Sequence, residues 1–284
     1  MTCFAALCIG PAIQAQEASP NLKAFFEGRL SNTPGTPPPS YQTLLKVIDT
    51  IERSDPRDLR TAIPVLSLAL ASKTTDVPAE AAFAFFAISR RRDGGALLRT
   101  NAPEIAALMM STDTRLSAGS VAILRNLTAS IPDVTVPLLM NRLRGATPPT
   151  LVTAEAVRAL LESPMRTEPN VLRTVEEYLA VSADQSVTVE NLHAIMANGV
   201  TTPVITKFVL GALSDKRPQV QMAAITTTAA LGAGVREQAR STIGRLANDP
   251  NADKDVRSLA ERALQNKLSD PYVVTDHPAP PKLK

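Results

Sequence analysis

The chain has 284 residues, of which 44% are hydrophobic and 20% are charged, and this balance excludes a disordered or fibrous protein. Aromatic residues make up 4% and tryptophan is absent, so the core must be built from small and aliphatic side chains, which favours helices over sheets. The net charge of +3 at pH 7 is small for this length, so charge alone does not indicate a binder of nucleic acids or acidic membranes.

Residues 1–15 form an uncharged, largely apolar stretch that ends in Ile13-Gln14-Ala15. An apolar run followed by a small residue is typical of a secretory signal peptide, although no lysine or arginine precedes it. We therefore expect export to the periplasm or the extracellular space. Cleavage after Ala15 would remove both cysteines, Cys3 and Cys8. No other stretch approaches the ~18 uninterrupted apolar residues of a membrane-spanning helix, so none is expected in the mature chain.

Residues 16–40 contain one short amphipathic piece, Leu22 to Leu30, and a run rich in proline, glycine and threonine that cannot continue a helix. This composition predicts a flexible, proline-rich linker. We expect a repeat domain over residues 41–268, with a helix from Tyr41 as its N-terminal cap. Residues 269–284 predict an extended tail.

One helical pattern recurs six times in the repeat domain. Each copy has an apolar residue at position zero, a small residue in most copies at position four, and apolar or small residues at positions seven and eight, all on one helix face. A second apolar segment precedes each copy. Helix pairs spaced by 33 to 39 residues predict an all-α solenoid, in which each pair buries its face by stacking on its neighbours. The residues at position zero are Val77, Leu116, Val152, Val187, Val220 and Val256.

The last copy has the most specific motif. It resembles the HEAT repeat, whose second helix reads V-R-x-x-A-x-x-A-L after a D-P turn, and the tetratricopeptide pattern of Trp, Leu, Gly and Tyr is missing. The resemblance implies about six HEAT-like helix pairs whose second helices line a concave protein-binding surface. The matching residues are Leu246, Asp249, Pro250, Val256, Arg257, Ala260, Ala263 and Leu264. Upstream, the position of Arg257 holds Pro78, Ser117, Thr153, Thr188 and Gln221, so the family's polar ladder is not expected from this position.

Charged side chains on the last helix indicate the end of the array. Lys254, Asp255, Glu261 and Arg262 are expected to face solvent, because no seventh repeat follows to cover them.

The sequence contains no recognisable catalytic or metal-binding constellation. The two histidines, His193 and His277, lie far apart, and there is no Cys/His cluster, glycine-rich phosphate loop or nucleophile elbow. We therefore expect no enzyme activity, no metal and no cofactor. The basic run Arg90 to Arg92 is interpreted as cations at a helix C-terminus, with a small anionic docking patch as the alternative.

The outward face of the second helices is the candidate binding surface. Positions two, six and nine lie opposite the buried face at ~100° per residue, and they are unusually apolar. One interpretation is that neighbouring repeats bury this face; the other is an apolar groove for a peptide or a partner helix. The candidate residues are Phe83, Phe86, Arg158, His193 and Met222, with Val189 and Met196 beside them.

The expected function is that of a monomeric, non-catalytic protein–protein interaction scaffold, with a protein or peptide partner and no nucleic acid. The alternative is an enzyme or enzyme-accessory protein, because some HEAT-like solenoids are chromophore lyases or DNA glycosylases. A glycosylase would need tryptophan or tyrosine against the extruded base. The three tyrosines, Tyr41, Tyr178 and Tyr272, are expected on a cap helix, a first helix and the tail. The lyase alternative has no sequence feature for or against it beyond the repeat.

Overall fold

The structure, a computed structural model, describes residues 21–31, 38–74, 76–144, 149–181 and 183–267. The expected signal peptide (1–15) and tail (269–284) lie outside these residues. Every regular element in the described ranges is a helix. None of the described helices combines the length and the apolar composition that crossing a membrane requires.

The chain divides into two compact units, and the boundary falls inside α4 (Val77–Ser89), between Ala84 and Phe85. The first unit contains α1 (Leu22–Ser31), α2 (Tyr41–Arg53), α3 (Pro56–Leu70) and the start of α4. The helices of the second unit are α5 (Gly94–Leu98), α6 (Ala102–Ala107), the 3₁₀ turn η1 (Leu108–Met110), α7 (Thr114–Leu127), α8 (Pro132–Arg144), α9 (Leu151–Glu162), α10 (Pro169–Leu179), α11 (Gln185–Asn198), α12 (Pro203–Ala212), α13 (Pro218–Ala230), α14 (Ala233–Asn248) and α15 (Lys254–Leu264).

Helix α1 belongs to the packed first unit. It contacts α3, and its apolar side chains Leu22 and Phe26 are buried, Phe26 completely. Burial of Phe26 alone contributes roughly 1.5–3 kcal/mol. The sequence places α1 in a flexible linker with the domain starting near Tyr41. In the structure the packed part of the chain also includes α1, which begins about twenty residues before Tyr41, because α1 covers apolar surface on α3.

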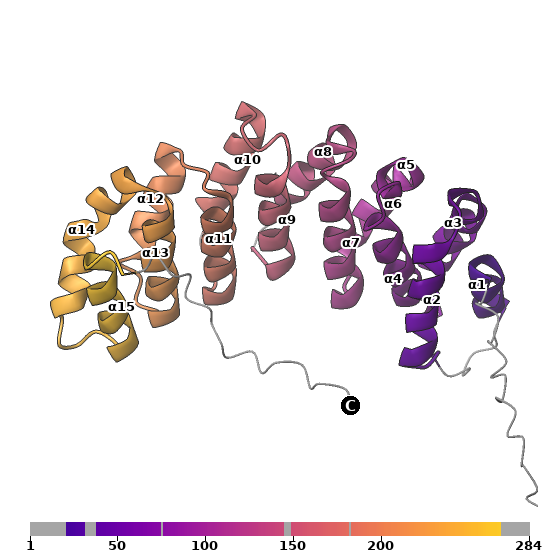
Figure 1. The fold of residues 1–284 in the computed structure, drawn as a ribbon, viewed down its shortest axis with the longest axis horizontal. Coiled ribbons are helices and arrows are strands. Elements are labelled where there is room, and N and C mark those ends of the chain that lie inside the picture. The colour runs from indigo at the N-terminus through magenta and orange to yellow at the C-terminus, as the bar shows by residue number, and fades with distance from the viewer. Residues whose placement is uncertain (1–20, 32–37, 75, 145–148, 182, 268–284) are drawn as a thin grey trace, which may run out of the picture. The chain divides into compact units, whose positions relative to one another are not determined.

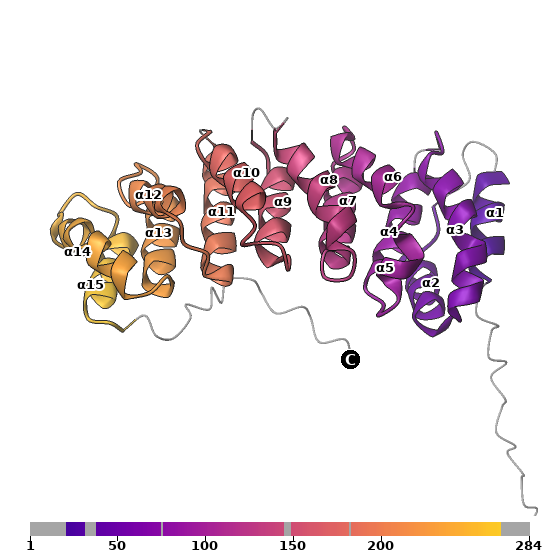
Figure 2. The ribbon, with the colours of Figure 1, turned by 90° about the horizontal axis from the view of Figure 1, so that it is seen from above.

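The second unit is a stack of two helix layers (Figure 1). One layer consists of α7, α9, α11, α13 and α15, each packed on the next, and the other consists of α6, α8, α10, α12 and α14. Figure 2 shows the same succession from above. Since consecutive helices of the chain alternate between the layers, each repeat is one helix pair, and the predicted all-α solenoid is confirmed.

The repeat pattern identifies the core of α11 and α13 fully, whereas the position-zero residues Leu116 of α7 and Val152 of α9 are half-buried. In α11, the residues at positions zero, four, seven and eight are at most 2% exposed, and the corresponding residues of α13 are completely buried. In α15, Leu264 at position eight is 38% exposed, while Val256 and Ala260 are buried. The three predicted solvent-facing residues Lys254, Asp255 and Glu261 are exposed, and Arg262 is half-buried.

Short polar side chains and prolines determine where the helices begin. Asp184 accepts a hydrogen bond from the Val187 N–H, and Thr202 accepts one from the Ile205 N–H, so each side chain satisfies a backbone donor that the helix leaves free. Pro203 occupies the first turn of α12, where its missing N–H costs nothing. At the other end of α11, Gly199 has φ +63° and closes the helix in the left-handed conformation.

Candidate functional site

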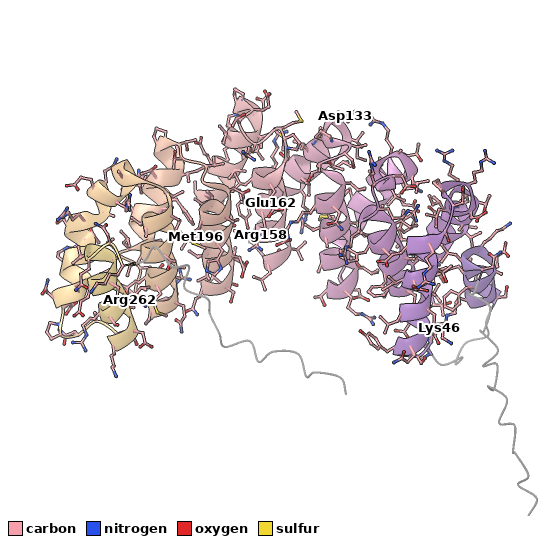
Figure 3. The ribbon with its side chains drawn as sticks, viewed as in Figure 1. Lys46, Asp133, Arg158, Glu162, Met196 and Arg262 are labelled. Carbon is pink, nitrogen blue, oxygen red and sulfur yellow. The ribbon has the colours of Figure 1, made fainter. Side chains whose placement is uncertain are left out.

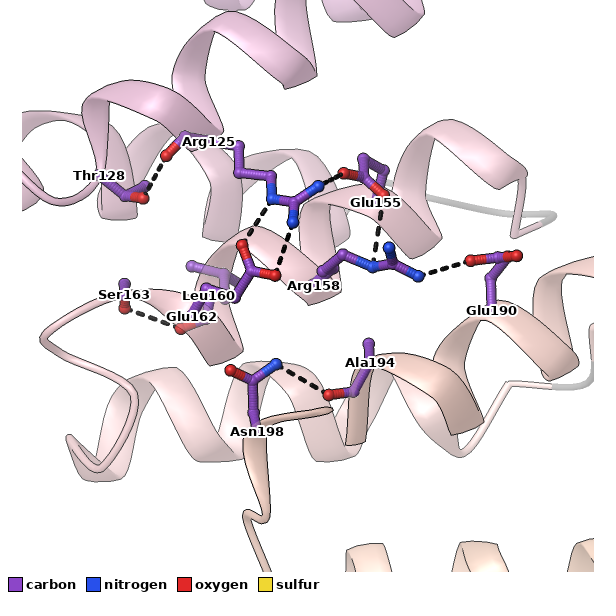
Figure 4. Close-up of polar contacts among 10 residues, drawn as sticks. All are labelled: Arg125, Thr128, Glu155, Arg158, Leu160, Glu162, Ser163, Glu190, Ala194 and Asn198. Carbon is purple, nitrogen blue, oxygen red and sulfur yellow. Dashed lines mark hydrogen bonds and ion pairs between the residues drawn. The ribbon is translucent and has the colours of Figure 1, made fainter. Parts of the chain in front are cut away.

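Charged side chains connect α9 to α11 on the layer formed by the second helices. Glu155 and Arg158 lie about one turn apart on α9, and Glu190 and His193 hold the same positions on α11, 35 residues later. Because these helices pack side by side, Arg158 Nη2 donates to Glu190 Oε2 at 2.7 Å (Figure 4). Arg158 Nε also lies 3.6 Å from Glu155 Oε2.

Arg125 extends this row to α7. Its Nη1 donates to Glu155 Oε1 at 2.5 Å, and its Nε and Nη2 donate to the two carboxylate oxygens of Glu162 at 2.5 and 2.7 Å. The bonds to Glu162 are the main reason that the pKa of Arg125 is raised. We call Arg125, Glu155, Arg158, Glu162 and Glu190 the charge ladder.

The charge ladder is open to solvent. Its side chains are between 26% and 41% exposed, so each ion pair contributes at most about 1 kcal/mol to stability. Three carboxylates face two guanidinium groups, which leaves one negative charge uncompensated within the ladder. His193 Nδ1 lies 4.0 Å from Glu190 Oε1, at the edge of the ladder. The ladder therefore adds little to the stability of the fold and carries a net charge of −1 on its own five residues.

Apolar side chains follow the charge ladder on α11 and α13. Val189, Met196 and Met222 are half-buried and hold outward positions of two helices that pack side by side. We call these three residues the apolar patch. Figure 3 labels Arg158 and Met196 on neighbouring helices of the same layer, whereas Asp133 lies on α8 in the other layer. The candidate surface is the charge ladder together with the apolar patch.

The structure places three of the five candidate residues of the predicted groove on or beside the candidate surface, and the other two on α4. Arg158, His193 and Met222 lie on or beside the candidate surface. Phe86 is half-buried in α4 of the same unit, and the Arg90 guanidinium carbon lies 5.9 Å from the centre of its ring. Phe83 is half-buried in the first unit. The candidate surface is therefore confined to the second unit and does not include Phe83.

The prediction of a mainly apolar face is wrong for α9. In α9 the outward positions two and nine, Ala154 and Leu161, are buried, which leaves Arg158 as the outward side chain. The outward pattern also omits position three, where Glu155 and Glu190 lie. A signal was present in the sequence, because an acid at position three and a base at position six recur in the copies that begin at Val152 and Val187.

The positions at which HEAT repeats carry arginine have a different role in this chain. Ser117, Thr153 and Thr188 occupy them, and all three are buried. Each hydroxyl donates to a carbonyl oxygen three or four residues earlier, and the Thr153 hydroxyl also shares a hydrogen bond of 2.8 Å with the Tyr178 hydroxyl. The charge ladder uses other positions of the repeat.

Within the described ranges, no three or more histidine, cysteine, aspartate or glutamate side chains are grouped so that they could hold a metal ion. The carboxylates of the charge ladder are instead engaged with guanidinium groups. The candidate surface can therefore form ion pairs with a partner in place of its own and cover apolar side chains of that partner.

No family model and no curated protein matches the sequence. Among solved structures, an engineered protein matches with a TM-score of 0.49 and 18% identity, covering 87% of this chain and 68% of its own. A designed armadillo repeat protein matches with a TM-score of 0.34 and 15% identity, covering 86% and 99%. Another, solved with the peptide (KR)4, has a TM-score of 0.33, 14% identity and coverage of 86% and 98%. Likenesses at these scores carry no argument about function, and the repeat architecture rests on the helix contacts described above.

Proposed function

We propose that this protein is a monomeric, non-catalytic scaffold that binds an extended segment of another protein along the outward face of α7, α9, α11 and α13. The observation that carries this proposal is the continuity of the candidate surface. The charge ladder and the apolar patch lie on helices in unbroken succession, so one segment crossing the layer meets both. The repeats are of the HEAT type in this proposal, on the strength of the motif around Asp249, Pro250 and Val256.

The chemistry of the surface indicates which segment it would accept. Glu190 is the most exposed member of the charge ladder, at 41%, and it lies on the same helix as Val189 and Met196 of the apolar patch. A lysine or arginine of the partner can pair with Glu190, which leaves Arg158 with Glu155. Apolar side chains a few residues further along would then cover the apolar patch. The proposed partner segment therefore contains a basic residue followed or preceded by apolar residues.

The test is selection of peptides from a random library on the purified full chain, followed by affinity measurement. We expect selected peptides to combine a basic residue with apolar ones, and the variant Glu190→Lys/Met222→Asp to weaken their binding by at least about tenfold, as loss of a charged pair and an apolar contact requires. The matched control is Glu177→Lys/Leu138→Asp on α10 and α8 of the other layer. Circular dichroism verifies that both variants remain helical.

Equal loss of binding in both variants would assign the effect to general destabilisation and reject this surface. Undiminished binding by Glu190→Lys/Met222→Asp would reject it as well. Selection of acidic peptides would contradict the proposed charge preference.

A further inference from the structure

A pocket lies on the other layer of the second unit, away from the candidate surface. It opens between α10 and α12 beside the N-terminal half of α11, and its volume is about 590 Å³. This volume is within the range of small-molecule binding sites. Leu179, Val181, Val204 and Phe208 provide apolar walls.

Exposed apolar side chains lie at the rim of this pocket. Val181 and Val204 are 38% and 42% exposed, and both line the same opening from opposite sides. Exposed apolar side chains that converge on a concavity indicate a surface that is covered in use. The α10–α12 pocket therefore has an apolar mouth as well as apolar walls.

The floor of the pocket is polar and includes an unused acceptor. Tyr178 and Asn191 line it and are 3% and 2% exposed. The Tyr178 hydroxyl is bonded to Thr153 and also interacts with the Asn191 amide, but Asn191 Oδ1 accepts no hydrogen bond from any described residue. Buried amide oxygens in folded proteins are nearly always paired. This oxygen is closed to solvent, so a donor delivered into the pocket can meet it only after the amide turns toward the opening.

The charged residues of the pocket leave one positive charge. Arg217 and Asp215 pair with each other, with Nε–Oδ1 and Nη2–Oδ2 distances of 2.8 and 2.7 Å. Lys207 of α12 is exposed and forms no ion pair with any described residue. An anionic group at the mouth would therefore be attracted by Lys207 and opposed by no unpaired carboxylate of the lining.

We propose that the α10–α12 pocket binds a small organic carboxylate with an apolar body and a hydroxyl or N–H donor at its far end. The body lies among Leu179, Val204 and Phe208, the carboxylate pairs with Lys207, and the donor serves Asn191. This site shares the N-terminal half of α11 with the proposed protein-binding surface but uses other residues of it: Thr188 and Asn191 line the pocket and are buried, whereas Val189 and Glu190 are partly exposed.

Calorimetric titration of the full chain tests this proposal with three matched probes. They are 3-(4-hydroxyphenyl)propionate, 3-phenylpropionate, which lacks the donor, and 3-(4-hydroxyphenyl)propionamide, which lacks the charge. We expect the hydroxylated acid to bind about fivefold more tightly than either analogue, as one added hydrogen bond or one exposed ion pair provides. In Lys207→Gln the acid and the amide should bind equally.

A steric variant supplies the decisive control. Gly211 lines the pocket on α12, and a Cβ placed on it has no neighbour within 4 Å, so Gly211→Leu can fill the mouth without disturbing the core. Gly244 of α14 has equally free space. Gly211→Leu should abolish binding of the acid, and Gly244→Leu should leave it unchanged.

Three results would overturn the proposal: no binding of the hydroxylated acid at millimolar concentration, equal affinity for all three probes, or full binding by Gly211→Leu.

The C-terminus of a peptide offers the same chemistry as the free acid. Tighter binding of acetyl-Gly-Gly-Tyr than of the free acid, lost when its carboxylate is amidated, would identify a protein chain end as the source; the reverse order would identify a small metabolite.

Discussion

Arg29 and Glu80 form a bidentate ion pair that is almost closed to solvent, with Nε–Oε2 and Nη2–Oε1 distances of 2.8 and 2.7 Å. The two residues are 51 positions apart and connect α1 to α4 within the first unit. Both charges are removed from water, so each depends on the other for its stabilisation. The pair therefore links α1 to α4 by two charged hydrogen bonds.

Replacing one member of this pair should be costly, and replacing both should not. Arg29→Met leaves the buried Glu80 carboxylate without its guanidinium, and we expect a loss of about 3–5 kcal/mol. Arg29→Met/Glu80→Leu should recover most of it, because apolar side chains of similar size need no partner in this site. Urea unfolding gives both values. A double variant as unstable as the single one would show that the ion pair itself holds α1 in place.

The charge ladder should contribute to stability weakly and in a salt-dependent manner. A double-mutant cycle of Arg158→Gln and Glu190→Gln should give a coupling energy of about 0.5–1 kcal/mol at 0.1 M salt, because both side chains are partly exposed. The coupling should decrease at 1 M salt, where the screening length falls to about 3 Å. Thermal unfolding measures it.

The control for this cycle pairs Glu190→Gln with Arg173→Gln on α10, which bonds to Asn170 instead. These two changes should be additive. Coupling of equal size in the control would indicate that the charge ladder acts only through the overall charge of the unit.

Tyr178 should make stability decrease in alkali. Burial raises the pKa of this hydroxyl above its ordinary value of about 10. Above that pH the unfolded chain loses the proton while the folded chain still holds it, so the folded state binds more protons and its stability falls as pH rises. The stability difference between wild type and Tyr178→Phe should shrink from about pH 10 upward. A difference that stays constant between pH 8 and 11 would contradict this.

Two glycines with equal free space should respond in opposite directions to alanine. Neither Gly199 nor Gly211 has an atom within 4 Å of an added Cβ. Gly199 has φ +63°, so Gly199→Ala should cost about 1 kcal/mol. Gly211 lies inside α12, and Gly211→Ala should stabilise by about 0.5–1 kcal/mol through helix propensity and reduced freedom of the unfolded chain. Chemical unfolding at one pH compares both, and the same sign for the two variants would contradict the assignment to φ.

The repeat period alone predicts the helix pairs of the second unit, their order and the buried faces of α11 and α13. Position zero and its companions are apolar or small because a solenoid repeat can bury its surface only against the repeats on either side. The spacing of Val187, Asn191, Ala194 and Ile195 therefore identifies the core without coordinates, and helix N-caps such as Asp184 mark where the elements begin. These are local properties of period and capping.

Which polar groups meet depends on how the helices pack. Arg29 reaches Glu80 over 51 residues, and Arg158 reaches Glu190 over 32, because packed helices turn these side chains toward one another. Whether Asn191 Oδ1 has a hydrogen-bond partner likewise depends on which groups of the neighbouring helices surround it. Helix period says which face a residue occupies, but the partner of a charge depends on the rotation and offset of the neighbouring helix, which are set by the packing of the whole stack.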